Sequence, residues 1–458
     1  MTGVEMIEKL KDYSEFHGVE IKASEFGGTG VFATEPLAKD DIVVKIPKES
    51  VLSPRTTQLA PILQQYDDLE PVNALITAYL FEKALDENSK WYEFISQIND
   101  AQLPDIPGLW SSEEKRLLKG TNIGLWVSLD TDEIEQGYAD AKKVLKKLKS
   151  LTGHKVDFPE WRNAALIVSS RSFDVDNYHD LSLVPGACLF NHSDRESLHF
   201  ETDGNVCGKC GSLSCECEDS WEDDDDMKEE EEEEEVEDFN SEEEDDDEES
   251  DEQVESSEEG EFVDEENAYE AGQKKGKEEV REVGVNICEM RLLRDVALGE
   301  EIFNTYGNDP NGVLLSRYGF AIWNNTHDIV DFEREVEKLA KEAKLSKKVK
   351  VWRSKQEKQL ETESNDEESE ELLFVGLING IDDVRYSLGL ISLAKALKLE
   401  VDNFAHQLSR ARYQKYLVRE NSSEIKQKLT QEKSSRLKMA LIAVGTEKLL
   451  LESVLSKH

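Results

Sequence analysis

The chain of 458 residues is long enough for two or three domains, and its 38% of hydrophobic residues can build buried cores. The formal net charge of −47 is concentrated in residues 218–267, where 33 Asp and Glu face only one basic residue, Lys228. Such a tract argues against direct binding of nucleic-acid phosphates, and no apolar run of about 18 residues indicates a membrane span.

Four of the six cysteines are crowded into residues 207–217, which is not the pattern of a secreted disulfide framework. The charged start of the chain has no signal-peptide core. We therefore expect a reducing compartment, the cytoplasm, the nucleus or both. The basic stretch 344–358 is either a nuclear signal or a charged helix face.

Residues 1–55 begin with apolar positions at helical spacing in 4–16, which predict a short helix. Alternating apolar residues from Val19 then predict short strands, and the glycines of 27–30 predict a turn between two of them. Residues 56–165 carry helical patterns, with a capping box formed by Ser111 and Glu114. A β unit is thus followed by a helical block.

Short β-like runs return within residues 166–325, at 181–190, 283–288 and 295–303. The acidic segment 218–270 interrupts them, and we expect it to be disordered. After residue 320 no further strands are expected. A charged stretch at 331–372 leads into predicted helices at 373–399, 403–417 and 424–456, so that 326–458 form a helical domain.

The glycine-rich stretch at 27–30 does not indicate a phosphate or dinucleotide loop, because a strand and not a helix follows it. The motifs of serine hydrolases, zinc proteases and P-loop proteins are missing from the sequence. The cysteine cluster consists of Cys207, Cys210, Cys215 and Cys217. Its spacing suits a structural zinc ion, and thiols without a metal are the alternative.

Asn191 and His192 follow an apolar run, and taken singly they would be ordinary core residues. They belong, however, to an ordered series of motifs: GGTGVFA at 27–33, SRSF at 170–173, NHSD at 191–194, GEEIFNTYG at 299–307 and RYGF at 317–320. This series resembles the SET-domain protein methyltransferases. The similarity is to the branch that includes the Rubisco large-subunit lysine methyltransferase and fungal methyltransferases of ribosomal proteins and translation factors.

The resemblance spans residues 15–330 in motifs and 331–458 in general character. It implies an α+β fold in which a β-rich SET domain is split by a helical insert and followed by a C-terminal all-α domain with the substrate-binding role. It also implies S-adenosylmethionine as the cofactor. The residues implied to bind this cofactor are Gly28, Thr29, Gly30, Arg171, Asn191, His192 and Tyr306.

Within this set, glycines would be needed because side chains would collide with the cofactor, and Arg171 would face its carboxylate. Tyr306 would be the catalytic tyrosine, and Phe173, Tyr318 and Phe320 would line the channel for the substrate lysine. The chain departs from the family pattern at Cys188, three positions before the Asn-His pair, where related sequences commonly carry an acidic residue.

The expected function is S-adenosylmethionine-dependent lysine N-methylation of a non-histone protein, a ribosomal protein or a translation factor. Methyl transfer to an amine is an in-line displacement, so alignment matters more than a general base. Two alternatives stay open: a protein-histidine methyltransferase, and a catalytically silent SET fold that binds basic partners through its acidic segment. We expect a monomer without membrane partners.

Overall fold

The computed structural model describes residues 3–457 except 26–27, 67, 124–130, 214, 216, 218–285, 361–370, 372 and 381–382. The acidic segment predicted to be disordered therefore lies outside the described residues. Residues Met1–Cys215 and Val283–His458 form one compact unit. Within the described part, no helix combines the length and the apolar character needed to cross a membrane.

Two four-stranded sheets form the β-rich region, and each combines strands from both sides of the helical block. The first sheet has the order β1 (Glu15–Phe16), β4 (Ile42–Pro47), β9 (Ile287–Leu292), β8 (Leu198–Thr202). The second has the order β2 (Val19–Ala23), β3 (Thr29–Ala33), β10 (Glu301–Asn304), β7 (Asn191–His192). Inward-facing aliphatic side chains from both sheets, among them Val31, Val44 and Ile302, share one buried core. The two halves of the sequence therefore fold as one β domain.

As predicted, β2 and β3 pair antiparallel, and residues 26 and 27 between them lie outside the described residues. The predicted strand at 181–190 is shorter than expected. It ends as β6 (Leu181–Leu183), which pairs with β5 (Ser172–Asp174). Pro185 and Gly186, the latter at φ +87°, then turn the chain into a 3-10 turn at Ala187–Leu189. Asn191 and His192 thus form a strand of their own and do not end a longer one.

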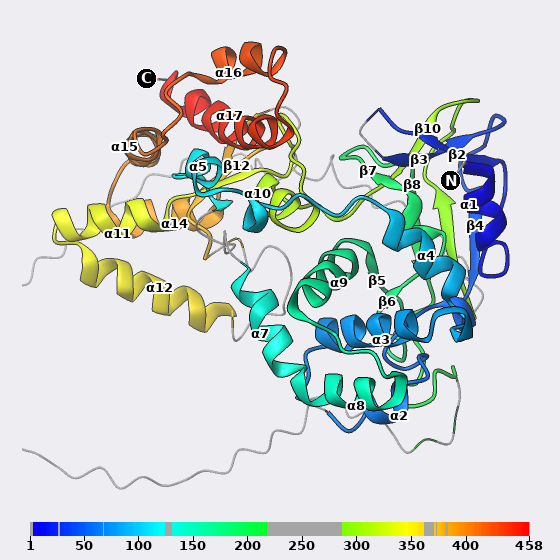
Figure 1. Ribbon diagram of the computed structural model, residues 1–458. Helices are drawn as coiled ribbons and strands as arrows, with labels where there is room; N and C mark the ends of the chain where they lie inside the picture. Colours follow the sequence, from blue (N-terminus) through cyan, green and yellow to red (C-terminus); the bar gives the residue numbers. More distant parts are fainter. Residues whose placement is uncertain are drawn as a thin grey trace, which may run out of the picture. The chain divides into compact units, whose positions relative to one another are not determined.

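The helical block packs around two tryptophans, Trp91 and Trp161, which are almost fully buried. Figure 1 shows its helix α3 lying between α8 and α9, and α3 contacts both. The predicted capping box is confirmed at the start of α5, where Ser111 accepts the N–H of Glu114. The helices of this block are α2 (Ala60–Leu63), α3 (Pro71–Leu85), α4 (Tyr92–Asp100), α5 (Ser112–Leu117), α7 (Asp132–Asp140), α8 (Lys142–Thr152) and α9 (Phe158–Arg171), and α1 (Gly3–Leu10) contacts α4.

The C-terminal region is not purely helical, contrary to the sequence prediction. Residues after 320 form a three-stranded sheet of β11 (Ile329–Asp331), β12 (Gly376–Ile378) and β13 (Arg385–Tyr386). These strands are too short to leave an alternating pattern in the sequence. The predicted helix at 373–399 begins only at Leu388. The helices here are α10 (Asn311–Val313), α11 (Glu333–Glu342), α12 (Ser346–Leu360), α14 (Leu388–Leu397), α15 (Val401–Tyr413), α16 (Ser422–Leu429) and α17 (Ser435–Leu455).

Part of the predicted helical insert packs with this C-terminal region. Trp110, Leu118 and Ile123 share a small core with Ala440 and Ala443 of α17. The buried Asn122 adds polar links. Its backbone N–H donates to Glu447 at 2.7 Å, and its side-chain amide donates to the carbonyl of Ile329 at 2.6 Å. Because a buried polar group costs stability unless it is bonded, Asn122 fixes the register of this interface.

Candidate active site

The pairing of β7 with β10 brings the Asn-His pair next to Tyr306. The two strands run parallel, with Asn191 opposite Phe303 and His192 opposite Asn304. Two residues beyond β10, the backbone N–H of Tyr306 donates to Nδ1 of His192 over 2.9 Å. Since an amide N–H can only donate, Nδ1 is an acceptor and the ring is not doubly protonated. Burial also lowers the pKa of His192, which favours the same neutral state.

The hydroxyl of Tyr306 is held by a second bond. It donates to the backbone carbonyl of Phe190 at 2.9 Å. Burial of Tyr306 raises the pKa of its hydroxyl to about 12, so the hydroxyl keeps its proton at neutral pH. A hydroxyl whose hydrogen is already committed still has lone pairs that can accept. The ring is thus fixed at both ends, and its oxygen can face a positively polarised group.

Tyr306 also lines a cavity of about 100 Å³. It is lined by Ser170, Arg171, Ser172, Phe173, Cys188, Phe190, Asn304, Thr305, Tyr306 and Tyr318. Pockets for drug-sized ligands commonly have several hundred Å³, so this cavity is narrow. It suits one narrow side chain.

Aromatic rings surround the tyrosine on several sides. The ring centroids of Tyr306 and Tyr318 are 4.7 Å apart, and Phe320 lies 6.0 Å from Tyr318 and 5.6 Å from His192. Of the three predicted channel residues, Phe173 and Tyr318 line the cavity, whereas Phe320 stands behind Tyr318 and His192. The result is an apolar wall that would strip water from a chain entering the cavity.

Arg171 lies in the cavity wall at the end of α9. Its Nη1 donates to the carbonyl of Cys188 at 3.0 Å. A guanidinium has five N–H donors, so in the described part of the chain Arg171 retains donors for an anionic ligand. The thiol of Cys188 is buried, which raises its pKa and keeps it neutral. Three positions before the Asn-His pair, this chain therefore presents a neutral thiol.

The glycine turn meets Asn191 at the other side of β10. The side-chain amide of Asn191 donates to the carbonyl of Thr29 at 3.1 Å and to Oε1 of Glu301 at 2.8 Å. A Cβ atom on Gly30 would lie 2.0 Å from the same Oε1, whereas one on Gly28, at φ +65°, would meet nothing within 4 Å. A side chain at residue 30 would therefore have to displace the carboxylate of Glu301, a contact that the sequence did not reveal.

Glu301 is the site residue that sequence reasoning missed. Its Oε2 accepts a hydrogen bond from Ser24 at 3.0 Å, so one carboxylate links Ser24, directly after β2, to Asn191. The residue lies inside the motif GEEIFNTYG. The signal that could have found it is strand alternation, since Glu301 shares a face of β10 with Phe303, which pairs with Asn191.

The four clustered cysteines also come together. All four Sγ atoms lie within 4.8 Å of one another, and all six cysteines of the chain are described without a disulfide. A closed set of four thiol ligands fits the predicted structural zinc. This cluster is separate from the residues that line the cavity.

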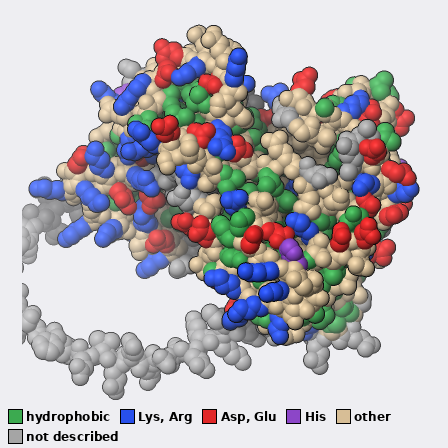
Figure 2. Space-filling model, viewed as in Figure 1, with side chains coloured by type: hydrophobic (Ala, Val, Ile, Leu, Met, Phe, Trp, Pro, Cys, Tyr) green, Lys and Arg blue, Asp and Glu red, His purple; other side chains and the backbone are tan. Residues whose placement is uncertain are grey.

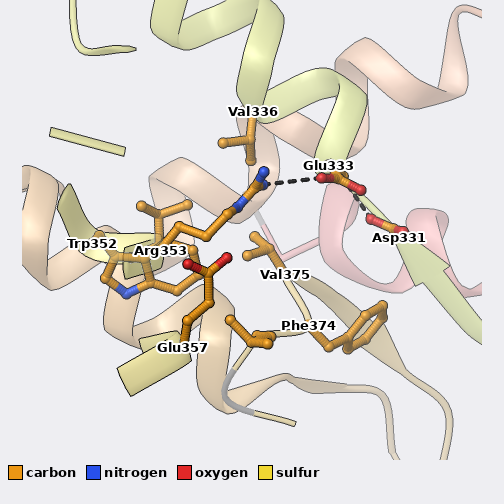
Figure 3. A pocket seen from close by; sticks show the side chains of 10 residues that line it. Asp331, Glu333, Val336, Trp352, Arg353, Glu357, Phe374 and Val375 are labelled. Atoms are coloured by element: carbon orange, nitrogen blue, oxygen red, sulfur yellow. Dashed lines mark hydrogen bonds and ion pairs between the residues drawn. The ribbon is translucent and has the colours of Figure 1, made fainter. Parts of the chain in front are cut away.

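A second, larger pocket belongs to the C-terminal region and contains none of the predicted site residues. In Figure 3 the side chain of Arg353 crosses this pocket and points to Glu333, with which it forms an ion pair of 3.0 Å. Figure 2 shows Lys and Arg side chains gathered over the neighbouring α12. Trp352 of α12 is buried, whereas the lysines of this helix are exposed, as in a charged helix face.

Comparison with solved structures identifies the fold. A structure of Rubisco LSMT bound to sinefungin and monomethyllysine aligns with a TM-score of 0.57, covering 99% of this chain and 90% of that one at 14% identity. The chain has the split SET-domain fold. In this fold, β7, which carries Asn191, pairs with β10, which ends two residues before Tyr306.

Sequence comparison adds relatives of this SET protein. It is 31% identical to ribosomal lysine N-methyltransferase 3 of Saccharomyces cerevisiae, a match that covers 73% of this chain and 64% of that protein. It is 26% identical to ribosomal lysine N-methyltransferase 4 of Schizosaccharomyces pombe, covering 71% and 65%. The matched region is less than two thirds of the length of either relative. No protein-family model matches the chain.

Proposed function

We propose that this protein is an S-adenosylmethionine-dependent protein-lysine N-methyltransferase. One observation carries the proposal: Tyr306, which is fixed by His192 and by the carbonyl of Phe190, lines a narrow cavity together with Phe173 and Tyr318. The names of the relatives, ribosomal lysine N-methyltransferases 3 and 4, support both this reaction and a ribosomal protein as substrate. A translation factor is the other non-histone substrate that we predict, and the cytoplasm or nucleus remains the predicted compartment.

The residues around the cavity fit the proposed cofactor. Arg171 offers guanidinium donors suited to its carboxylate, and Asn191 with His192 offers backbone and side-chain groups beside the glycine turn of residues 28–30. S-adenosylmethionine, when bound, supplies an electrophilic methyl group. Structures of Rubisco LSMT, which has this fold, have been solved with S-adenosylmethionine and with lysine bound.

The proposed role of the chain is to align and desolvate. A free lysine has a pKa of about 10.4, so its amine must lose a proton before it can attack. Phe173 and Tyr318 would surround the aliphatic stem and exclude water, which lowers the pKa of the amine and lets solvent take the proton. With the cofactor bound, an N–C bond would form as the C–S bond of the sulfonium breaks, and the Tyr306 oxygen would orient the methyl group by weak C–H···O contacts.

The test is transfer of labelled methyl from S-adenosylmethionine to proteins in an extract of cells that lack this enzyme, followed by amino-acid analysis of the labelled band. We expect labelled methyl-lysine in one ribosomal protein or translation factor. Labelled methyl-histidine would favour the histidine alternative. No labelled protein, together with no binding of S-adenosylmethionine by calorimetry, would leave the silent interaction module as the better account.

A further inference from the structure

We propose that Cys207, Cys210, Cys215 and Cys217 bind one zinc ion that fixes residues 207–217 to the β domain, directly before the acidic segment begins in the sequence. The Sγ atoms lie within 4.8 Å of one another. Tetrahedral zinc with Zn–S bonds of about 2.3 Å needs sulfurs about 3.8 Å apart, so small side-chain rotations complete the site. Four soft thiolates and no oxygen ligand favour zinc over magnesium or calcium.

The backbone at the first cysteine pair is already shaped for a metal. The carbonyl of Cys207 accepts the N–H of Gly211 at 2.7 Å and that of Cys210 at 3.3 Å. The N–H of Lys209 points at Sγ of Cys207, 3.4 Å away. Gly211 has φ +74°, a conformation that favours glycine. This tight turn places two sulfurs on one side of the chain, and the N–H donor stabilises a thiolate, as groups around bound metals do.

The turn is also seated on a rigid part of the SET domain. A Cβ atom on Gly208 would lie 3.2 Å from the carbonyl of Asn177, and one on Gly211 would lie 3.1 Å from the ring of Tyr178. The two glycines of the turn thus allow it to approach residues 177–178 closely. A side chain at either position would force the turn away from this surface.

Residues 177–178 are themselves anchored by a buried ion pair. Asp176, directly before them, lies 2.8 Å from Nζ of Lys48, whose side chain also donates to the carbonyl of Asp203 at 2.8 Å. Both side chains are almost fully buried, so breaking this pair would leave an uncompensated charge. The proposed ion therefore sits beside residues that a buried ion pair holds in place, close to the end of β8.

The physical consequence is that the metal closes a short loop. It holds Cys217 beside Cys207, so the chain enters the acidic segment from a fixed point. Because zinc binding requires a folded arrangement of deprotonated thiols, its binding free energy stabilises this local structure. The proposal needs no assumption about methyl transfer, and its tests do not use enzymatic activity.

The first test is metal content. Full-length protein, purified under reducing conditions without added metal, should contain one zinc per chain by mass spectrometry, and cobalt should replace it with the spectrum of tetrahedral thiolate coordination. Cys210→Ser and Cys217→Ser should lose the metal. The matched control is Cys288→Ser, which also removes one thiol. Cys288 lies in β9 opposite Thr202 of β8, so this variant should keep the metal. Wild-type protein without metal, with iron instead, or with a Cys207–Cys210 disulfide would overturn the zinc assignment.

The second test uses the lysine inside the turn. Trypsin should cut after Lys209 only when a chelator has removed the metal, because the bound ion holds this peptide in its turn. Lys398, an exposed residue at the end of α14, provides a cleavage site whose rate should not depend on the chelator. Equal cleavage after Lys209 with and without chelator would contradict the proposal, even if every cysteine variant failed to fold.

Discussion

Replacing Tyr306 by phenylalanine removes one oxygen from the site and keeps the ring. The variant loses the 2.9 Å hydrogen bond to the carbonyl of Phe190. The loss of one buried hydrogen bond costs about 1–2 kcal/mol of unfolding free energy, a tolerable share of the roughly 5–15 kcal/mol typical of domains. The protein should therefore remain folded.

The expected effect on methyl transfer is larger than the effect on stability. The hydroxyl fixes the ring of Tyr306, which lines the cavity. Without it the reacting groups should be slightly misaligned, and such misalignment costs about 100-fold in rate, or about 2.7 kcal/mol in the barrier. We expect the turnover number to fall by this order while the affinity for S-adenosylmethionine changes little. Tyr318→Phe is the matched control, because its hydroxyl makes only a 3.5 Å contact with the carbonyl of Tyr306.

Initial rates of label transfer, calorimetry of cofactor binding and thermal unfolding should be measured on both variants. The reasoning predicts a large loss of rate in Tyr306→Phe and a loss of only a few-fold in Tyr318→Phe. It fails if the two variants lose the same activity, or if Tyr306→Phe keeps nearly the wild-type rate. A loss of rate that merely follows the fraction unfolded would also refute it.

Three further predictions concern Glu301, Gly30 and Asp328. A glutamine at position 301 can no longer accept hydrogen bonds from both Asn191 and Ser24, so calorimetry of Glu301→Gln should show about tenfold weaker binding of S-adenosylmethionine. The control Glu300→Gln should change this binding little, because the Glu300 carboxylate pairs at 2.7 Å with the exposed Arg294. Gly30→Ala should push Glu301 aside and weaken the binding of S-adenosylmethionine by the same route. The losses of binding free energy should therefore be less than additive in the double variant Gly30→Ala/Glu301→Gln. Fully additive losses would show that the two positions act independently. Burial raises the pKa of Asp328 from 3.8 to about 7. Between these two values the folded chain holds a proton that the unfolded chain has released. The unfolding free energy should therefore fall as the pH rises from about 4 to about 7, by at most about 4 kcal/mol. Urea unfolding across this range should show a shallower fall in Asp328→Asn, and an identical slope would exclude Asp328 as the cause.

Much of the site could be predicted because its residues lie in contiguous motifs. Asn191, His192 and Tyr306 occupy two short segments whose strands pair directly, so their order in the sequence carried over into space. The hairpin turn at the glycines was also predictable, because alternating residues on both sides define its strands. What these cases share is a local pattern that the backbone follows.

The features that escaped prediction depend on contacts between distant segments. Strands β11 and β12 are three residues long and are stabilised by pairing with each other, not by a pattern of their own. The packing of Trp110 and Ile123 against α17 brings together residues more than 300 positions apart, and no periodicity records it. Glu301 was overlooked because its role becomes visible only when Asn191 and Gly30 converge on its carboxylate.

The bond between Tyr306 and His192 joins residues 114 positions apart, with the acidic segment lying between them in sequence. For an unfolded chain, the entropy lost in closing such a loop grows only with the logarithm of its length, about 0.6 kcal/mol for each doubling. Lengthening or trimming the intervening segment is therefore thermodynamically cheap for the pairing of β7 with β10. Evolution could vary that segment widely without disturbing the catalytic geometry.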